Sequence, residues 1–500
     1  MNRHMNRFLK LPILCLIASM ASCNVLEQDP ISDITLDKAF EGEPDMQAAV
    51  VGVYNRLAME VAGAANEMPL RYLYNGEYRA DSYISSRVVA YQAAQQGNFD
   101  NTWPWANWQN YYSTLRNINN LLYYGKNIPD NRFTSVQTKN RLFGEGYFLR
   151  ALVYFNLVRV WENIVLRTEP TLDTKGDVNG LQAPPASVLK QIEADLLLAA
   201  QLMPREYPSA NRGRATRGAA QALLAKYYVY ISSPYAQKYL NVGSPQWAKA
   251  ASWADSVIRT PTLYSLVPGS SYGTIFTQNG TNESILELVY DALITGPNPT
   301  NDLTGHFLPR KNTVPTGGTL QLQPSDKLID AFKAQKDSLR FNGAMAEIRV
   351  ADGWLAADVG KNAPGIVQKY NNHYVKKYPG TIQGTVRNGD SNIILLRLAD
   401  VILLRAEALL EAGDVPGAQR ELDKITTRAG IAKRTVSVDE VLLQRWMELC
   451  FEGDRWYDLK RRMLLEKETG AFAAYPKGYL FPIVNGEMLN NPNVKQNPGW

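Results

Sequence analysis

The sequence has few residues of the types that build metal sites and disulfides. Its 500 residues include three cysteines and three histidines. No Cys/His group has the spacing of a zinc site, and three scattered histidines give almost no material for a His-based metal site or triad (His4, His306, His373). We therefore predict a protein without a metal or other cofactor.

A long hydrophobic run is also missing. The apolar run Leu11–Ser19 spans nine residues, well short of the roughly 20 that a membrane-crossing helix needs. It follows a basic start and is followed by Met20-Ala21-Ser22-Cys23, which is typical of a bacterial lipoprotein signal. We predict that residues 1–22 are a signal peptide and that Cys23 is lipidated. The alternative is an ordinary secretory signal with a chance cysteine near its cleavage site.

Strong charge of one sign is absent from the processed chain. Cleavage before Cys23 removes three basic residues and no acidic one, so the formal net charge of +5 falls to +2. This value argues against a nucleic-acid partner, which would need a basic stripe. Because Cys15 leaves with the signal and Cys23 carries lipid, Cys450 has no partner for an internal disulfide. We expect it to be a small buried side chain rather than a reactive thiol.

Helical periodicity dominates most of the remaining sequence. Small residues recur where helices would cross, and Ala412-Gly413-Asp414 has the turn pattern of a tetratricopeptide hairpin. Ser437 and Glu440 form a capping-box pattern that opens another helix. We predict a mostly α fold with a tetratricopeptide-like helix-pair scaffold. The predicted helices are 142–161, 186–203, 213–230, 247–258, 325–335, 392–412, 415–428 and one that begins at Ser437.

Residues 260–390 differ from this pattern. They hold 23 of the 62 glycines and prolines of the chain, and helical periodicity is lost apart from residues 325–335. This composition predicts an embedded, irregular, loop-rich subdomain. Loops on a rigid helical base commonly carry binding sites, although such a subdomain can also serve mainly to pack.

Two glutamates, Glu448 and Glu452, could suggest a glycosidase, because paired carboxylates cleave glycosidic bonds. Each acid in this region, however, has an arginine three residues away, where helical neighbours form ion pairs. Such pairing lowers the pKa of a carboxyl group and makes it a poor general acid. We therefore predict structural ion pairs and no enzymatic activity. The predicted pairs are Arg445 with Glu448, Glu452 with Arg455, and Asp458 with Arg461.

Several stretches resemble the SusD/RagB family of Bacteroidetes surface lipoproteins. The similarity extends from Cys23 to Trp500 and is weakest over 260–390, while Val484 replaces a proline that the family often has there. The resemblance divides the processed chain into helical regions at 23–259 and 391–500 and a variable, ligand-side subdomain at 260–390. The stretches that carry it are 150–155, 213–225, 392–408, 445–461, 481–487 and 496–500.

The candidate ligand-binding residues lie in two loops that the resemblance implies are near the ligand face. Trp103 and Trp105 precede a helix and could stack on sugar rings, whereas Trp108 and Tyr112 fit a helical core pattern. Residues of the preceding loop could donate or accept hydrogen bonds. For each candidate, local packing or capping is an equally acceptable role. The candidates in that loop are Arg79, Asp81 and Tyr83, and weaker ones in the variable subdomain are Tyr272 and Trp354.

The resemblance implies a non-enzymatic nutrient-binding protein that is lipid-anchored and exposed at the surface of the outer membrane. It would capture an oligosaccharide and deliver it to a SusC-like TonB-dependent transporter. A peptide ligand, as in other members of the family, or a purely helical assembly scaffold are alternatives, and a glycoside hydrolase is the least favoured. Its partners would be the transporter, the ligand and, through the acyl chains, outer-membrane lipid.

Overall fold

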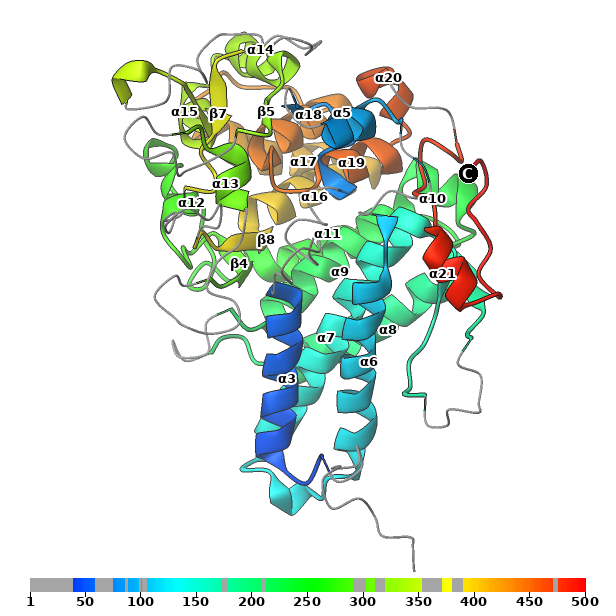
Figure 1. Cartoon of the computed structure of the whole chain (residues 1–500). Helices are drawn as coiled ribbons and strands as arrows, with labels where there is room; N and C mark the ends of the chain where they lie inside the picture. Colours follow the sequence, from blue (N-terminus) through cyan, green and yellow to red (C-terminus); the bar gives the residue numbers. More distant parts are fainter. Residues whose placement is uncertain are drawn as a thin grey trace, which may run out of the picture.

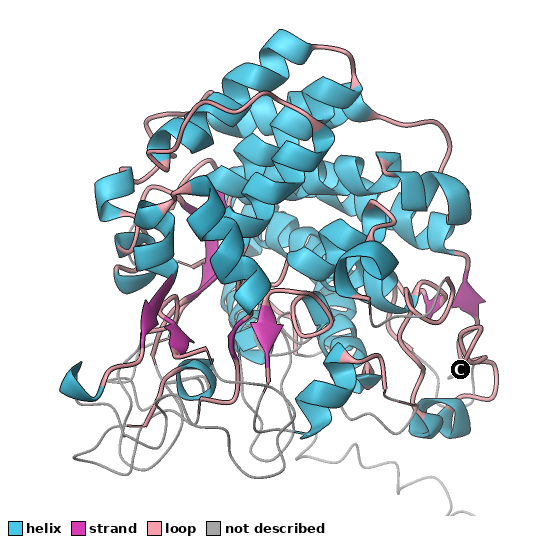
Figure 2. Ribbon diagram, turned by 90° about the horizontal axis from the view of Figure 1, so that it is seen from above, coloured by secondary structure: helices cyan, strands magenta, loops and turns pink. Residues whose placement is uncertain are grey.

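Helices make up most of the described part of the protein, and the strands are short (Figure 2). The computed structural model describes residues 39–58, 75–85, 89–98, 100, 106–171, 179–207, 213–290, 303–310, 320–352, 371–379, 390–470 and 475–500. The predicted mostly α fold is confirmed. The long helices are α3 (Glu43–Ala58), α6 (Gln109–Tyr124), α7 (Val136–Trp161), α8 (Pro185–Leu202), α9 (Arg217–Ser232), α11 (Trp247–Ile258), α16 (Leu398–Glu411), α17 (Val415–Arg428) and α18 (Val438–Leu449).

Helix α7 is the centre of the N-terminal part of the fold. The Ser135 hydroxyl accepts a hydrogen bond from the Thr138 amide at 3.0 Å and so caps its first turn. Two glycines let neighbouring helices approach closely: a Cβ on Gly144 would lie 2.7 Å from Met203, and one on Gly146 would lie 2.8 Å from Leu122. Helix α7 therefore packs against the end of α8 on one side and against α6 on another. Together α3, α6 and α7 form a column whose lower end projects from the body (Figure 1).

Most predicted helices appear close to their expected bounds, and α11 and α17 match theirs. Helices α16 and α17 form the predicted hairpin, in which Gly413 turns with φ +88° and the Asp414 carboxylate accepts from the Gly417 amide at 2.9 Å. The helix predicted from residue 392 begins only at Leu398, because the residues before it form a strand. That strand pairs with Ser284–Leu288 in the variable region, a contact that local periodicity does not reveal.

The capping box at the start of α18 is confirmed in part. The Ser437 hydroxyl accepts from the Glu440 amide at 3.1 Å. The Glu440 carboxylate instead pairs with Arg434 at 3.2 Å and accepts from the Gln444 amide group at 2.9 Å. A nearby cation thus outcompetes the backbone amide for the carboxylate.

Within the described residues, the strands form four antiparallel pairs. In two of these pairs, a strand of the region 260–390 pairs with a strand outside it, so this region is fastened to both flanking helical regions. Tyr83 pairs with Pro324 in one, and Ser284 pairs with Arg397 in the other. The pairs are β1 (Tyr83–Ile84) with β5 (Gln323–Pro324), β2 (Ile164–Val165) with β3 (Gln182–Ala183), β4 (Ser284–Leu288) with β8 (Ile393–Arg397), and β6 (Met345–Glu347) with β7 (His373–Val375).

One main hydrophobic cluster runs through the described residues, from Met46 on α3 to Val494 near the C-terminus. Among the described helices, none is both long and apolar enough to cross a membrane. Shorter helices cover the ends of the scaffold. They are α5 (Val89–Gln95), α10 (Pro234–Tyr239), α12 (Thr274–Thr277), α13 (Leu303–Phe307), α14 (Asp326–Gln335), α15 (Ser338–Ala344), α19 (Arg455–Arg461), α20 (Leu465–Thr469), α21 (Asn485–Asn490), and the 3-10 turns η2 (Gly125–Asn127), η3 (Asp130–Arg132), η5 (Gly269–Ser271) and η6 (Val350–Asp352).

Candidate functional site

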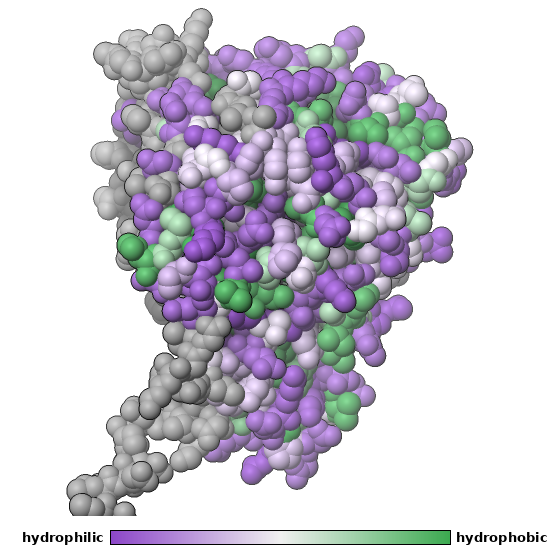
Figure 3. All heavy atoms as spheres, turned by 90° about the vertical axis from the view of Figure 1, so that its right-hand side faces the viewer, coloured by the Kyte–Doolittle hydropathy of each residue, from purple (hydrophilic) through white to green (hydrophobic). Residues whose placement is uncertain are grey.

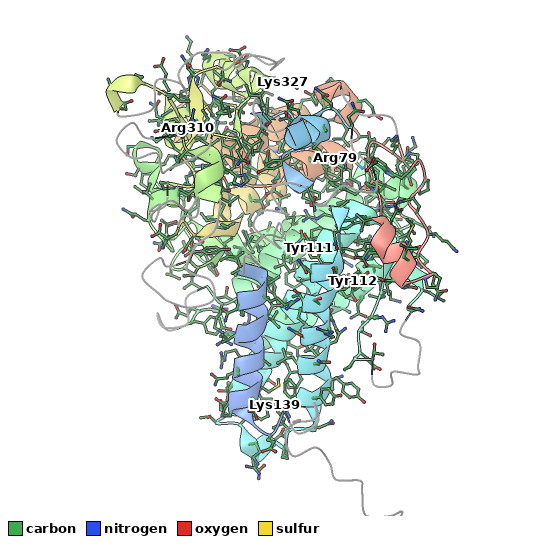
Figure 4. The ribbon with its side chains drawn as sticks, viewed as in Figure 1. Arg79, Tyr111, Tyr112, Lys139, Arg310 and Lys327 are labelled. Atoms are coloured by element: carbon green, nitrogen blue, oxygen red, sulfur yellow. The ribbon has the colours of Figure 1, made fainter. Side chains whose placement is uncertain are left out.

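Arg79, a predicted ligand-binding residue, lies in the protein interior. Its side chain is 1% exposed, and its guanidinium group stacks over the rings of Trp456 and Phe481 at 4.7 and 4.5 Å. Its Nη2 donates a hydrogen bond to the carbonyl of Gly478 at 2.7 Å. Burial lowers the pKa of Arg79 to about 9. Arg79 therefore fastens its segment to the C-terminal part of the chain and offers no surface to solvent (Figure 4).

Asp81 and Tyr83 are also bound to protein groups. Asp81 accepts two hydrogen bonds from Arg455, at 2.7 and 2.9 Å, and one from Lys327 at 2.6 Å. The Tyr83 ring, which is 3% exposed, stacks on Phe307 with centroids 5.7 Å apart. The two residues were predicted in a loop near the ligand face. Pairing of β1 with β5 instead places Tyr83 in a strand and buries its ring, while ligand binding by either residue stays a prediction.

Of the other predicted ligand-binding residues, one lies in the core and three lie outside the described residues. Trp103, Trp105 and Trp354 lie outside the described residues, as does Cys23. Tyr272 is 1% exposed, and its hydroxyl donates to the carbonyl of Glu448 at 2.9 Å, so this side chain packs in the protein interior.

The two glutamates that could suggest a glycosidase are buried within a network of ion pairs. Glu448 is fully buried and pairs with Arg397 at 2.7 Å, with Arg340 at 3.2 Å and with Arg428. Burial alone would raise the pKa of Glu448, but these three arginines outweigh it and hold the pKa well below its ordinary value. Glu448 cannot therefore supply a proton near neutral pH. Glu452 pairs with Lys377 at 2.6 Å and with Arg397 at 2.7 Å.

The predicted ion-pair partners were wrong in two of three cases. Only the pair of Asp458 with Arg461, at 2.8 Å, is present as predicted. Arg445 binds Asp400 and Asp458, at 2.7 and 2.8 Å, instead of Glu448. Glu452 and Arg455 do not share a helix, because α18 ends at Leu449 and α19 begins at Arg455.

Cys450 follows α18 and is buried as predicted. Burial raises the pKa of its thiol to about 12, which keeps it protonated and unreactive. Among the described side chains, no group of three or more His, Cys, Asp or Glu residues is arranged to hold a metal ion.

A pocket of about 320 Å³ opens beside the first turns of α6, three residues after Trp105. Two aromatic residues, Trp108 and Tyr112, are among those that line it. Trp108, which is 3% exposed, contacts the rings of Tyr112 and Trp161 edge to face, with centroids 5.6 and 5.7 Å apart. The predicted core role of Trp108 and Tyr112 is confirmed, and both also line this pocket.

The second wall of the α6 pocket is the segment 165–171, which is held tightly against α6 and α7. The Tyr112 hydroxyl donates to the carbonyl of Val165 at 2.8 Å, and the Asn119 amide group donates to the carbonyl of Arg167 at 3.0 Å. Arg150, bonded to Asp195 at 2.8 and 2.7 Å, also donates to the carbonyl of Thr168 at 2.9 Å. This wall is therefore preformed.

The third wall comes from α21 and the residues after it, on the right-hand face of the molecule in Figure 1. That face is largely hydrophilic, with separate hydrophobic patches (Figure 3). The Asn491 side chain ties the wall to the chain before β3 by donating to the carbonyl of Gly180 at 2.9 Å. Two residues of the wall, Glu487 and Asn490, line the pocket with polar groups.

The charges of the α6 pocket balance, with two arginines and two glutamates among the lining residues. Arg167 donates to the hydroxyl of Thr171 at 2.9 Å, whereas the exposed Arg116 forms no hydrogen bond or ion pair with the described residues. The sequence signalled the α6 side of this pocket through Trp108 and Tyr112. It gave no sign of the other walls, which come from segments hundreds of residues apart. The charged lining residues are Arg116, Arg167, Glu169 and Glu487.

Comparison with protein families identifies two matching stretches. Residues 355–500 match the family described as "SusD family", and residues 26–229 match the one described as "Starch-binding associating with outer membrane".

Individual relatives support the same relationship along the whole chain. "SusD-like protein P2" of Formosa agariphila is 25% identical over 538 aligned positions, which cover 98% of this chain and 99% of that protein. "Starch-binding protein SusD" of Bacteroides thetaiotaomicron is 34% identical, but only over 22% of either chain.

Solved structures share the fold. A "Laminarin binding SusD-like protein" superposes with a TM-score of 0.75 at 24% identity, over 92% of this chain and 100% of its own. "Surface glycan-binding protein A from Bacteroides uniformis" gives a TM-score of 0.72 at 19% identity, over 91% and 99%. The two matching stretches, together with the relatives that align along the whole chain, show that it is a SusD-like protein of the SusD/RagB family, whose members are non-catalytic binding proteins.

Proposed function

We propose that this protein binds an oligosaccharide at the surface of the outer membrane and delivers it to a SusC-like TonB-dependent transporter. Lipidation at Cys23 would hold it there. The matched description of starch-binding proteins that associate with the outer membrane supports both the ligand class and the location. The buried, arginine-bound state of Glu448 and Glu452 supports binding without hydrolysis.

The observation that carries the proposal is the pocket beside α6. Carbohydrate sites combine an aromatic surface, on which sugar rings stack, with a few fixed polar groups that bind hydroxyls. Trp108 and Tyr112 line the pocket, together with Asn490 and with Asn119 and Asn491, which hold its walls through bonds to the carbonyls of Arg167 and Gly180. Trp103 and Trp105 directly precede it in the sequence, and we propose that they extend the stacking surface. The absence of net charge in the lining suits an uncharged oligosaccharide.

The test is binding of a panel of oligosaccharides and peptides by calorimetry, using wild type and the variants Trp103→Ala and Trp105→Ala. Loss of a stacking tryptophan should weaken glycan binding by about 1 to 3 kcal/mol and leave the melting temperature almost unchanged. Trp253→Ala on α11 is the matched control and should leave affinity unchanged, because Trp253 lies outside the pocket lining. Unchanged affinity together with a collapsed melting temperature would place Trp103 and Trp105 in the core. Binding of peptides but not glycans would replace the proposed ligand class.

Anchoring is tested separately with Cys23→Ala, which should release the protein from the outer-membrane fraction. Retention of the variant in that fraction after a high-salt wash, in cells that lack the transporter, would contradict lipid anchoring.

A further inference from the structure

A second pocket, of about 370 Å³, lies between the first turns of α7 and the end of α8. It differs in charge from the pocket beside α6. Arg141 and Arg217 line it, and none of the described lining residues carries a carboxylate. The remaining polar lining consists of neutral amide and hydroxyl groups, including those of Gln137 and Thr138. The described lining therefore carries two positive charges, of which the one on Arg141 is shared with Glu145 behind the pocket.

The guanidinium groups in this α7–α8 pocket have donors to spare. Arg217 uses Nε to donate to the carbonyl of Met203 at 3.2 Å, and its two terminal nitrogens form no hydrogen bond or ion pair with the described residues. Arg141 lies 3.4 Å from Glu145, a fully buried acid that Arg214 binds more closely, at 2.8 and 3.0 Å. Since a guanidinium group carries five N–H donors, both arginines can bind an oxyanion without giving up these contacts.

The backbone of α7 adds to this positive potential. The first turns of α7, a helix of 26 residues, line the pocket. The N-terminal end of a helix carries the positive pole of its dipole. Ser135 caps the amide of Thr138, while the amides of Val136 and Gln137 have no partner among the described residues. Two arginines beside such a helix start favour an anion with several oxygens, of which phosphate is the common biological case.

The pocket lies at the end of the molecule from which the chain continues toward Cys23. Just before α7, the amide of Thr134 donates to the carboxylate of Glu43, the first residue of α3, at 2.6 Å. Both helices begin at the lower end of the column in Figure 1, where Figure 4 labels Lys139. Cys23 lies only 16 residues before Ala39, so an anchor there is at most roughly 60 Å of extended chain away.

We propose that the α7–α8 pocket binds a phosphate group, carried either by a membrane-lipid headgroup or by a soluble phosphate ester. The phosphate site rests on the two arginines and the helix start alone. The lipid source in addition rests on the proposed anchoring at Cys23.

The test uses the full chain carrying Cys23→Ala, so that acyl chains cannot mediate membrane binding. Two measurements are made: calorimetric titration with inorganic phosphate, and co-sedimentation with phosphatidylcholine vesicles with or without phosphatidylglycerol. In this background, Arg217→Gln should weaken phosphate binding at least tenfold. Arg259→Gln, an exposed arginine that pairs with Asp255 outside both pockets, is the matched control and should bind within twofold of its parent.

Gln137→Glu keeps the test valid if Arg217→Gln misfolds. Gln137 is exposed and lies in the first turn of α7, where an acidic residue favours the helix. The variant should therefore keep its melting temperature but weaken phosphate binding at least fivefold through like-charge repulsion.

Each outcome has a definite meaning. Binding to phosphatidylglycerol vesicles that exceeds binding to inorganic phosphate, and that both variants lose, identifies a lipid headgroup. Variant-sensitive binding of inorganic phosphate without vesicle binding identifies a soluble ester. If the Cys23→Ala parent binds neither probe, or if Gln137→Glu in that background binds like the control, the site is overturned. None of these results bears on the tryptophan test of the glycan pocket.

Discussion

Glutamates and arginines meet in two regions of this protein with opposite consequences. In the interior, fully buried Glu448 is surrounded by three arginines. In the pocket beside α6, the exposed Arg116 forms no hydrogen bond or ion pair with the described residues, although two glutamates share the same lining. The residue types are the same. Burial and the saturation of partners therefore separate a structural charge from one that can meet a ligand.

This difference has an energetic basis. Burial of an ion pair carries a large desolvation penalty, which the attraction between the two charges offsets. Removal of one partner leaves an uncompensated charge that water cannot reach. An exposed charge is solvated and screened, and its removal changes the free energy of unfolding little. The two regions should therefore respond differently to the same kind of substitution.

The largest expected effect is that of Glu448→Gln. The substitution leaves three arginines with one carboxylate fewer, so we expect the free energy of unfolding to fall by about 3 to 5 kcal/mol. Denaturant titration measures this. Asp330→Asn is the matched control, because Asp330 and its partner Lys333 are largely exposed, and it should change stability little. A loss of less than about 1 kcal/mol for Glu448→Gln would contradict the expected difference between buried and exposed charges.

A smaller effect with the opposite sign is expected at Glu77. This carboxyl group is fully buried, and burial raises its pKa to about 8. The folded protein therefore holds the proton more tightly than the unfolded chain, whose glutamate has a pKa of about 4.3. The stability from Glu77 is fully present below about pH 4.3 and is lost as the pH rises toward 8.

Glu77→Gln removes this dependence while it keeps an oxygen that can accept from the Gly453 amide, which lies 3.2 Å from Glu77. We expect the variant to be more stable than wild type by at least about 1 kcal/mol at pH 8, with a smaller difference at pH 5. Denaturant titrations at the two pH values measure it. A difference that does not depend on pH would show that Glu77 does not titrate in this range.

The smallest expected effect is that of Arg116→Gln at the rim of the α6 pocket. Loss of one donor to a sugar hydroxyl should weaken glycan binding by about 0.5 to 1.5 kcal/mol, with the melting temperature unchanged. Arg259→Gln, outside the pocket, should alter neither quantity. A drop in melting temperature without a change in affinity would make Arg116 a structural residue and remove the contrast with Glu448.

Local sequence patterns predicted the scaffold well. The bounds of α11 and α17, the turn at Gly413, the cap at Ser437 and the burial of Cys450 depend on neighbours within a few residues. Helical periodicity, small residues at crossings and capping side chains carry this information, because helix formation is governed by contacts between residues three and four positions apart.

The same reasoning failed where the partner lies far along the chain. Helical spacing paired Arg445 with Glu448, but Arg445 binds Asp400 and Asp458. Arg79 and Tyr83 were assigned to a loop, yet Tyr83 lies in β1 and pairs with β5, and Arg79 is buried against Trp456 and Phe481. In each case a long-range contact outweighed the local pattern.

The sequence by itself determined the helical scaffold and the resemblance to the SusD/RagB family, because both depend on contiguous residues. It also predicts a lipid anchor at Cys23. Only the tertiary structure decided which charges are buried and which line pockets. The α6 pocket joins residues 108–119, 165–171 and 487–494, and the α7–α8 pocket joins Arg141 to Arg217. A pocket forms where segments that are distant in the sequence meet in space. Which segments meet depends on the burial of side chains, and local spacing in the sequence does not specify that burial.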